Sequence, residues 1–194
     1  MSKSFALKGL IVDTPVPGEL RCREGYLVCA DGVVEGFYDV LPEQWTGIDV
    51  QDCAGKLIIP GMSDLHLHAP QYSYCGMAMD LELLEWLDNY TYPEEARYAN
   101  MEHAKAYYEI FTRDLLHTAT TRAAIFATIH TDATLELMRQ LDKAGLGAYV
   151  GKLNMDRNCP DFYTEHTPEN GEAETRRWLE LCKAENFELL ARHA

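Results

Sequence analysis

From Leu57 onward, strand-like and helix-like segments alternate along this sequence. Apolar runs typical of buried strands lie at 57–68, 123–129 and 148–155, and a helical pattern follows each of them. Strands that alternate with crossover helices in this way predict a parallel α/β architecture, either an open doubly wound sheet or part of a (β/α)8 barrel. Neither Gly-x-Gly-x-x-Gly nor a P-loop follows any of these runs, which argues against the nucleotide-binding versions of this architecture.

Start and stop signals place a helix after each strand. The first helix begins at Pro93, because proline is favoured in a first helical turn, and apolar residues at helical spacing continue it to about His117. We expect Asp132 to cap the second helix and Gly145 to end it. Thr167, followed by proline and glutamate, opens the third.

The N-terminal residues have a different pattern. Short alternating runs with glycine and aspartate between them predict strands at 5–14, 19–30 and 33–40. The Asp-Gly pair at 31–32 is typical of a tight hairpin turn, so we expect a small antiparallel sheet. A Pro-Gly turn at 60–61 separates the two patterns. We therefore expect the N-terminal part of a small β-domain at 1–58 and α/β structure at 59–194.

The charge balance limits the classes of partner. The chain has 17 Lys and Arg against 31 Asp and Glu, which gives a formal net charge of −14. This balance argues against nucleic acid and anionic membranes as partners, because both are bound through clustered basic residues. No run approaches the roughly 18 consecutive apolar residues of a membrane span. The first residues do not have the pattern of a signal peptide.

The six cysteines are scattered and include no Cys-x-x-Cys pair. We expect free, reduced and mostly buried thiols in a cytoplasmic protein. The missing pair also excludes the zinc nucleobase deaminases that hold their metal with closely spaced cysteines. The positions are Cys22, Cys29, Cys53, Cys75, Cys159 and Cys182.

The segment PGMSDLHLH, at the first strand after the Pro-Gly turn, carries the most chemistry. Side chains alternate along a strand, so His66 and His68 are expected on one face, with Leu65 and Leu67 packed on the other. Asp64 would share the face of the histidines and hydrogen-bond to a metal ligand. Two imidazoles at the carboxyl end of a barrel strand can share a metal, although two structural histidines remain an alternative.

The pattern Pro-Gly-x-x-Asp-x-His-x-His after a small β-domain resembles the amidohydrolase superfamily, metal-dependent hydrolases built on a (β/α)8 barrel. Longer segments resemble the guanine deaminase family within it: HLHAPQYSYCGMAMDLELLEWLDNYTYPEE, FATIHTD and VGKLNMDRNCPDFY. The resemblance implies an incomplete metal-dependent hydrolase (β/α)8 barrel (TIM barrel), preceded by a small N-terminal domain of the β-sandwich type.

The resemblance also implies an activity and a site. One Zn²⁺ ion per complete active site would be held in part by His66 and His68, and guanine would be hydrolysed to xanthine and ammonia. His68 and Gln71 would contact the substrate, because a carboxamide offers both a donor and an acceptor to a guanine edge. Trp86 could stack on the purine, although aromatic residues at helical spacing are more often part of a core. His130 would lie near the metal ligands, or fill a structural role.

A complete barrel of this class has about 250 residues and eight strands. This chain supplies the first three β/α units at 59–194, with a fourth strand beginning at Phe187. The resemblance implies that no catalytic acid or base is present, because in this family the glutamate that transfers protons and the remaining metal ligands come from later strands. We therefore expect a truncated chain that is inactive alone and a homodimer at full length. The alternatives are another ring aminohydrolase of the superfamily, or a non-catalytic fragment that acts as an interaction partner.

Overall fold

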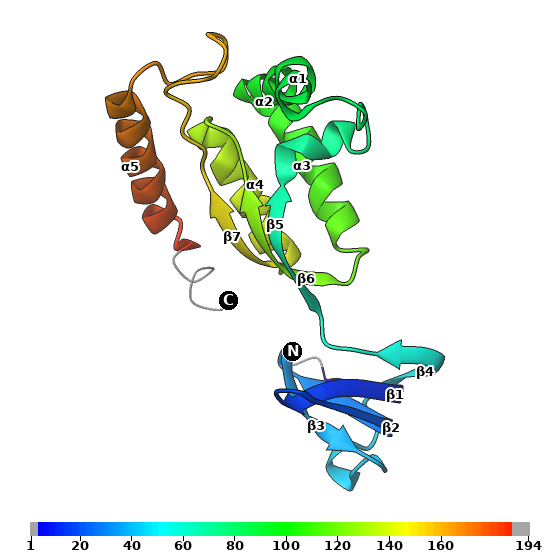
Figure 1. The fold of residues 1–194 in the computed structure, drawn as a ribbon. Helices are drawn as coiled ribbons and strands as arrows, with labels where there is room; N and C mark the ends of the chain where they lie inside the picture. The colour runs from blue at the N-terminus through cyan, green and yellow to red at the C-terminus, as the bar shows by residue number, and fades with distance from the viewer. Residues whose placement is uncertain (1–3, 188–194) are drawn as a thin grey trace. The chain divides into compact units, whose positions relative to one another are not determined.

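The structure, a computed structural model, describes residues 4–187. The chain divides into two compact units, Met1–Pro60 and Gly61–Ala194, with the boundary in sequence between Pro60 and Gly61 (Figure 1). Residues 188–194, into which the fourth predicted strand would extend, lie outside the described residues. No helix in the described part of the chain is long and apolar enough to cross a membrane.

The first unit contains a four-stranded sheet in the order β3-β2-β1-β4. Its antiparallel pairs are β1 with β2 and β2 with β3, and the hairpin turn predicted at Asp31 and Gly32 is confirmed by their φ angles of 53° and 79°. Buried Ile11, Cys53 and Ile58 form its small core. The elements are β1 (Phe5–Val16), β2 (Glu19–Ala30), β3 (Val33–Tyr38), a 3-10 turn η1 (Glu43–Trp45) and β4 (Asp49–Ile58).

The three predicted strands pair antiparallel, as expected, whereas β4 was not predicted as a strand and pairs parallel to β1. The segment between β3 and β4 carries the chain from one edge of the sheet to the other, so β4 arrives beside β1 and runs in the same direction. The described residues of this unit form one sheet, so they do not confirm the expected β-sandwich.

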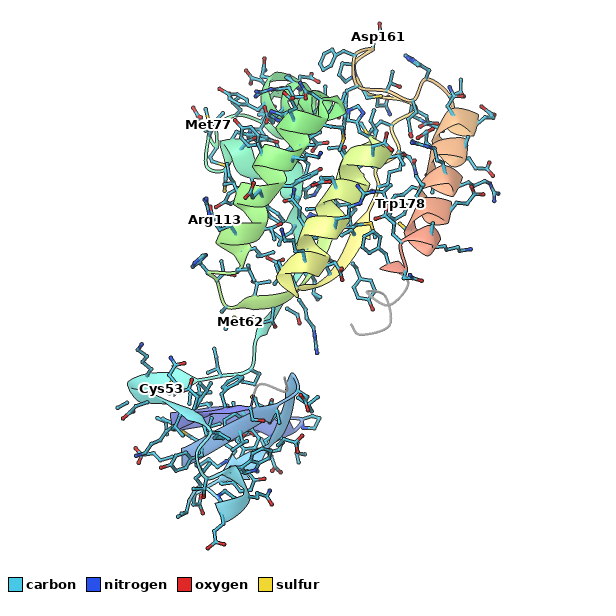
Figure 2. All side chains as sticks on the ribbon, turned by 180° about the vertical axis from the view of Figure 1, so that it is seen from behind. Cys53, Met62, Met77, Arg113, Asp161 and Trp178 are labelled. Atoms are coloured by element: carbon cyan, nitrogen blue, oxygen red, sulfur yellow. The ribbon has the colours of Figure 1, made fainter. Side chains whose placement is uncertain are left out.

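The second unit has the predicted parallel α/β architecture. Its sheet has the order β5-β6-β7, and both neighbouring pairs are parallel. The helices α3 and α4 cover one face of this sheet, as the two opposite views show (Figures 1 and 2). The main elements are β5 (Met62–His68), α3 (Met101–Leu115), β6 (Thr120–Phe126), α4 (Thr131–Ala144), β7 (Gly147–Gly151) and α5 (Pro168–Ala184).

Short helical segments lie between β5 and α3, beyond the carboxyl ends of the strands (Figure 1). They are η2 (Ala69–Tyr74), α1 (Leu83–Trp86), the π-helical turn η3 (Leu87–Thr91), α2 (Tyr92–Ala96) and η4 (Arg97–Ala99). This region carries Gln71 and Trp86, two of the predicted site residues.

The core of the second unit lies between the sheet and its two helices. Buried side chains of β6, α3, α4 and β7 form one cluster, and Leu67 of β5 packs against it. A smaller cluster joins α4 to α5 and includes buried Leu135, Met138 and Cys182. Trp178, labelled in Figure 2, packs against this cluster. The main cluster includes Ala104, Tyr108, Phe111, Leu115, Ala123, Ile125, Leu137, Leu141 and Ala148.

The helix predicted from Pro93 to about His117 is broken into separate segments. Asn100 has an extended backbone (φ −84°, ψ 114°), and its side chain accepts hydrogen bonds from the backbone amides of Glu102 and His103. An asparagine in this role is a helix N-cap, so α3 starts afresh at Met101.

The boundaries of the other helices test three predicted caps. His130, rather than Asp132, occupies the N-cap position of α4, so the cap prediction was wrong by two residues. Gly145 ends α4 in the left-handed region (φ 75°), as predicted. Thr167 caps α5 and accepts a hydrogen bond from the amide of Asn170, which confirms the predicted start.

Candidate metal and substrate site

His66 and His68 lie together at the carboxyl end of β5. Their Nε2 atoms are 3.2 Å apart, and the ring centroids are separated by 5.0 Å. Leu67, between them, packs against the cluster beneath the helices, so the two imidazoles are on the sheet face that α3 and α4 leave uncovered. The predicted juxtaposition of the two rings is therefore present.

The alternation along β5 is interrupted before the histidines. Asp64 pairs with Ala123 and Leu67 pairs with Ile125, so β5 uses one more residue than β6 between these positions. An extra residue in one strand is a β-bulge, which changes the face that the following side chains occupy. Leu65 is accordingly 80% exposed, and the expectation that it packs with Leu67 was wrong.

The same bulge changes the place of Asp64. Its Oδ1 accepts a hydrogen bond from the backbone amide of His66, with N and O 3.1 Å apart. The register puts Asp64 opposite Ala123, whose side chain is buried beneath the helices. Asp64 therefore stabilises the backbone of the histidine segment, and the predicted contact with a ligand ring is absent among the described residues.

Phe126, the last residue of β6, packs against both imidazoles. Its ring stacks on His68 with centroids 4.9 Å apart, and meets His66 edge-on at 5.3 Å. The sequence reasoning did not single out Phe126. The available signal was its position, because the end of the second parallel strand lies beside the end of the first.

The pair fits half of a zinc site. Two nitrogens bound tetrahedrally to one zinc ion at about 2.05 Å lie about 3.3 Å apart, close to the observed spacing. Burial, followed by the neighbouring His66, lowers the pKa of His68 and favours the neutral imidazole that binds metals. Within residues 4–187, no cluster of three or more His, Cys, Asp or Glu could hold a metal ion.

Gln71 lies in η2, three residues beyond His68, and its side chain contacts a buried carboxylate. Its Nε2 donates to Oε1 of Glu95, at 3.3 Å, while Oε2 of Glu95 accepts from the hydroxyl of Tyr163 at 2.7 Å. The amide of Ile129, just beyond β6, donates to the same hydroxyl at 3.3 Å. A chain of hydrogen bonds thus joins Gln71 to the region beyond the carboxyl end of β6.

Comparison with known proteins decides the family. The amidohydrolase family profile matches residues 57–191, which is more than half of the chain. The chain belongs to the amidohydrolase family.

Relatives within this amidohydrolase family share substantial sequence identity with the chain. Guanine deaminase of Homo sapiens is 42% identical over 134 residues, which are 68% of this chain and 29% of that protein. Guanine deaminase of Escherichia coli (strain K12) is 34% identical over 178 residues, which are 87% of this chain and 39% of that protein. The chain therefore spans well under half the length of these two relatives.

Solved structures agree with this assignment. The crystal structure of guanine deaminase from C. acetobutylicum with bound guanine in the active site matches with a TM-score of 0.81 and 43% identity. The match covers 90% of this chain and 42% of that chain. The E. coli guanine deaminase structure matches with a TM-score of 0.77 and 32% identity.

Two further predicted residues of this amidohydrolase chain have other contacts. Trp86 packs against Tyr74, with ring centroids 5.5 Å apart, and donates a hydrogen bond from Nε1 to the carbonyl of Met77. His130 lies edge-on to Tyr163 at 5.9 Å, and burial lowers its pKa. In the described part of the chain, no hydrogen bond joins His130 to His66 or His68.

Proposed function

We propose that this protein is a guanine deaminase, which hydrolyses guanine to xanthine and ammonia. The observation that carries the proposal is the pair of imidazoles at the end of β5, followed three residues later by Gln71, in a chain 43% identical to a guanine deaminase with bound guanine. In the net reaction one water is consumed and one ammonia leaves, so an oxygen replaces the amine at C2 of the purine.

His66 and His68 would hold a zinc ion through Nε2, which their 3.2 Å spacing supports. Zinc, when bound, supplies the Lewis acidity that lowers the pKa of a water molecule to near neutrality. Phe126 packs against both rings and restricts their orientation. Gln71 would bind one edge of the guanine, and Trp86 and His68 would line the same pocket.

We further propose that β5, β6 and β7 are the first three strands of a (β/α)8 barrel. Their parallel order, with helices on one face, supports this assignment. Two histidines fill only half of a four-coordinate zinc site. Catalysis therefore needs further ligands and a proton-transferring group from outside the described residues. A homodimer and a cytoplasmic location stay predictions.

The experiment expresses the complete protein from its gene, loads it with zinc and incubates it with guanine. We expect xanthine and ammonia in equal amounts. Replacing both histidines (His66→Ala with His68→Ala) should abolish xanthine formation and remove most of the bound zinc, measured per chain by atomic absorption. His117→Ala is the matched control, because His117 is exposed, lies outside β5 and has its Nδ1 bonded to the backbone carbonyl of Arg113.

Each outcome separates the proposal from its alternatives. Unchanged zinc in the double variant would reject the ligand assignment. Ammonia released from another amino-substituted purine, pyrimidine or triazine, with guanine untouched, would favour a related ring aminohydrolase. If no ring amine is hydrolysed by the zinc-loaded protein, the non-catalytic alternative is favoured.

A further inference from the structure

Glu95 is a buried carboxylate that lies beneath the segment carrying Gln71. It comes from α2, 24 residues further along the chain, and has 2% of its surface exposed. Among the described residues it forms no salt bridge, and its two oxygens accept from Gln71 and Tyr163. Burying a carboxylate without a neighbouring cation costs free energy of folding. The position of Glu95 beside Gln71, a candidate for substrate binding, therefore suggests a function for this carboxylate.

The chemistry of the contact determines how the Gln71 carboxamide is oriented. An ionised carboxylate only accepts hydrogen bonds, and the two ends of a carboxamide differ, because the nitrogen donates and the oxygen accepts. Glu95 can therefore pair with Nε2 of Gln71 but repels its oxygen. Consequently, one amide hydrogen is engaged by Glu95, and the carboxamide oxygen and the second hydrogen stay available.

We propose that Glu95 is a positioning residue, which holds the Gln71 carboxamide in one orientation so that its oxygen accepts from a guanine N–H. The inference rests on the proposed function, in which Gln71 binds guanine. A carboxamide free to rotate would present either its oxygen or its nitrogen to the guanine N–H. In the second orientation two hydrogen-bond donors would face each other, and no hydrogen bond would form. A fixed carboxamide avoids this loss and binds the edge at lower entropic cost.

The carboxylate is itself held by other parts of the fold. Tyr163, which is fully buried, donates to Oε2 of Glu95 and accepts from the backbone amide of Ile129. The loop that carries Tyr163 is closed by a buried ion pair between Lys152 and Glu165. The orientation of Gln71 is therefore tied to a rigid, hydrogen-bonded set of buried groups.

The segment that carries Gln71 is also held by a hydrogen bond. The hydroxyl of Tyr98, a fully buried residue, donates to the carbonyl of Pro70 at 3.3 Å, directly before Gln71.

Burial raises the pKa of Glu95 to about 6, so the carboxylate is ionised in an assay at pH 8. Under these conditions Glu95 acts only as an acceptor.

The first test observes the contact without activity. The 194-residue chain is labelled with ¹⁵N in its glutamine side chains, and the Gln71 signal is assigned by its loss in Gln71→Ala. We expect two well-separated amide proton shifts in the native chain at pH 8, because one proton is bonded to a carboxylate. In Glu95→Gln the shifts should move towards those of a solvated glutamine.

The second test uses kinetics of the complete protein at pH 8. Glu95→Gln is expected to raise KM for guanine about tenfold, the loss expected for one hydrogen bond to a charged group, with a smaller change in kcat. In a Gln71→Ala background the same substitution should change KM less than about twofold, because Glu95 acts only through Gln71. Glu94→Gln is the matched control, because the neighbouring carboxylate bonds to Arg97 and His103 instead.

A KM effect of Glu95→Gln that is equally large in both backgrounds would overturn the proposal, as would an unchanged Gln71 signal. If Glu95→Gln does not fold, Tyr163→Phe decides, because it releases the other carboxylate oxygen and should raise KM only when Gln71 is present. A native protein that leaves guanine intact would refute the proposed function, while the amide signal would still report whether Glu95 orients Gln71.

Discussion

Glu95 is ionisable and buried, and the charge of its carboxylate contributes to raising the pKa of five described tyrosines. They are Tyr74, Tyr92, Tyr98, Tyr108 and Tyr163. Removal from water destabilises its charged form, and the hydrogen bonds from Tyr163 and Gln71 compensate only in part, so the pKa rises to about 6. A single residue therefore makes stability depend on pH.

The sign of this dependence follows from the direction of the shift. The folded-state pKa of Glu95, about 6, lies above its ordinary value of 4.5, so the folded chain binds more protons between these two pH values. The contribution of Glu95 to the free energy of unfolding should therefore fall as pH rises, by about 1.6 kcal/mol between pH 4.5 and pH 7. We expect the stability of Glu95→Gln relative to native to rise by this amount over the same window.

Urea denaturation at pH 4.5 and pH 7 measures this difference, with circular dichroism at 222 nm as the signal. The described α-helices all belong to the second unit, so this signal follows the unit that contains Glu95. A stability difference between Glu95→Gln and the native chain that is the same at both pH values would contradict the prediction. Glu94→Gln again controls for the loss of a carboxylate at the adjacent position.

At the scale of elements, the start of β5 depends on a close approach of Gly61 to the side chain of Thr121. A Cβ placed on Gly61 would lie 2.1 Å from Oγ1 and 2.7 Å from Cβ of Thr121, in β6. The amide of Met62 donates to the carbonyl of Ala119 at 2.8 Å, which holds the two strands together at this point. Glycine is favoured here because a Cβ would force the Thr121 side chain to move.

Gly61→Ala should therefore lower the free energy of unfolding by about 1–3 kcal/mol, the usual cost of forcing atoms into a packed site. Gly151→Ala is the matched control at the end of β7, because a Cβ there meets nothing within 4 Å. Its effect should stay within about 0.5 kcal/mol. Urea denaturation followed at 222 nm checks both variants, and equal effects would show that the contact with Thr121 is unimportant.

At the scale of the whole molecule, the parallel sheet is covered by helices on one face only. Parallel sheets are normally buried on both faces. Large apolar residues of the sheet are accordingly exposed: Leu65 by 80% and Phe126 by 37%. In the proposed barrel, further strands would bury this uncovered apolar surface.

The 194-residue chain should therefore bind the apolar dye ANS, whose fluorescence reports exposed hydrophobic surface. Leu65→Lys is expected to lower this fluorescence, because it places a charge in the apolar surface. Leu20→Lys is the control, since Leu20 is also largely exposed, at 74%, but belongs to the other unit. Equal fluorescence of Leu65→Lys and the native chain would contradict the prediction.

Local features of this chain could be predicted because they depend on residues close in sequence. Hydrophobic periodicity and turn residues predicted the order of strands and helices, the hairpin at Asp31 and the ends of helices at Gly145 and Thr167. The cap at Asn100 was also a local signal, and it was missed because the apolar spacing continued across it. The spacing of His66 and His68 was sufficient to place them side by side.

Contacts between distant segments were decided only by the tertiary structure. The parallel pairing of β4 with β1 depends on where a connection crosses the sheet, and the exposure of Leu65 depends on a bulge relative to β6. The partners of Glu95 lie 24 and 68 residues away in sequence, at Gln71 and Tyr163. The sequence specifies which side chains are apolar and which can bind a metal, hydrogen-bond or ionise. Which of them meet is determined by packing, because burial and hydrogen bonding act between neighbours in space.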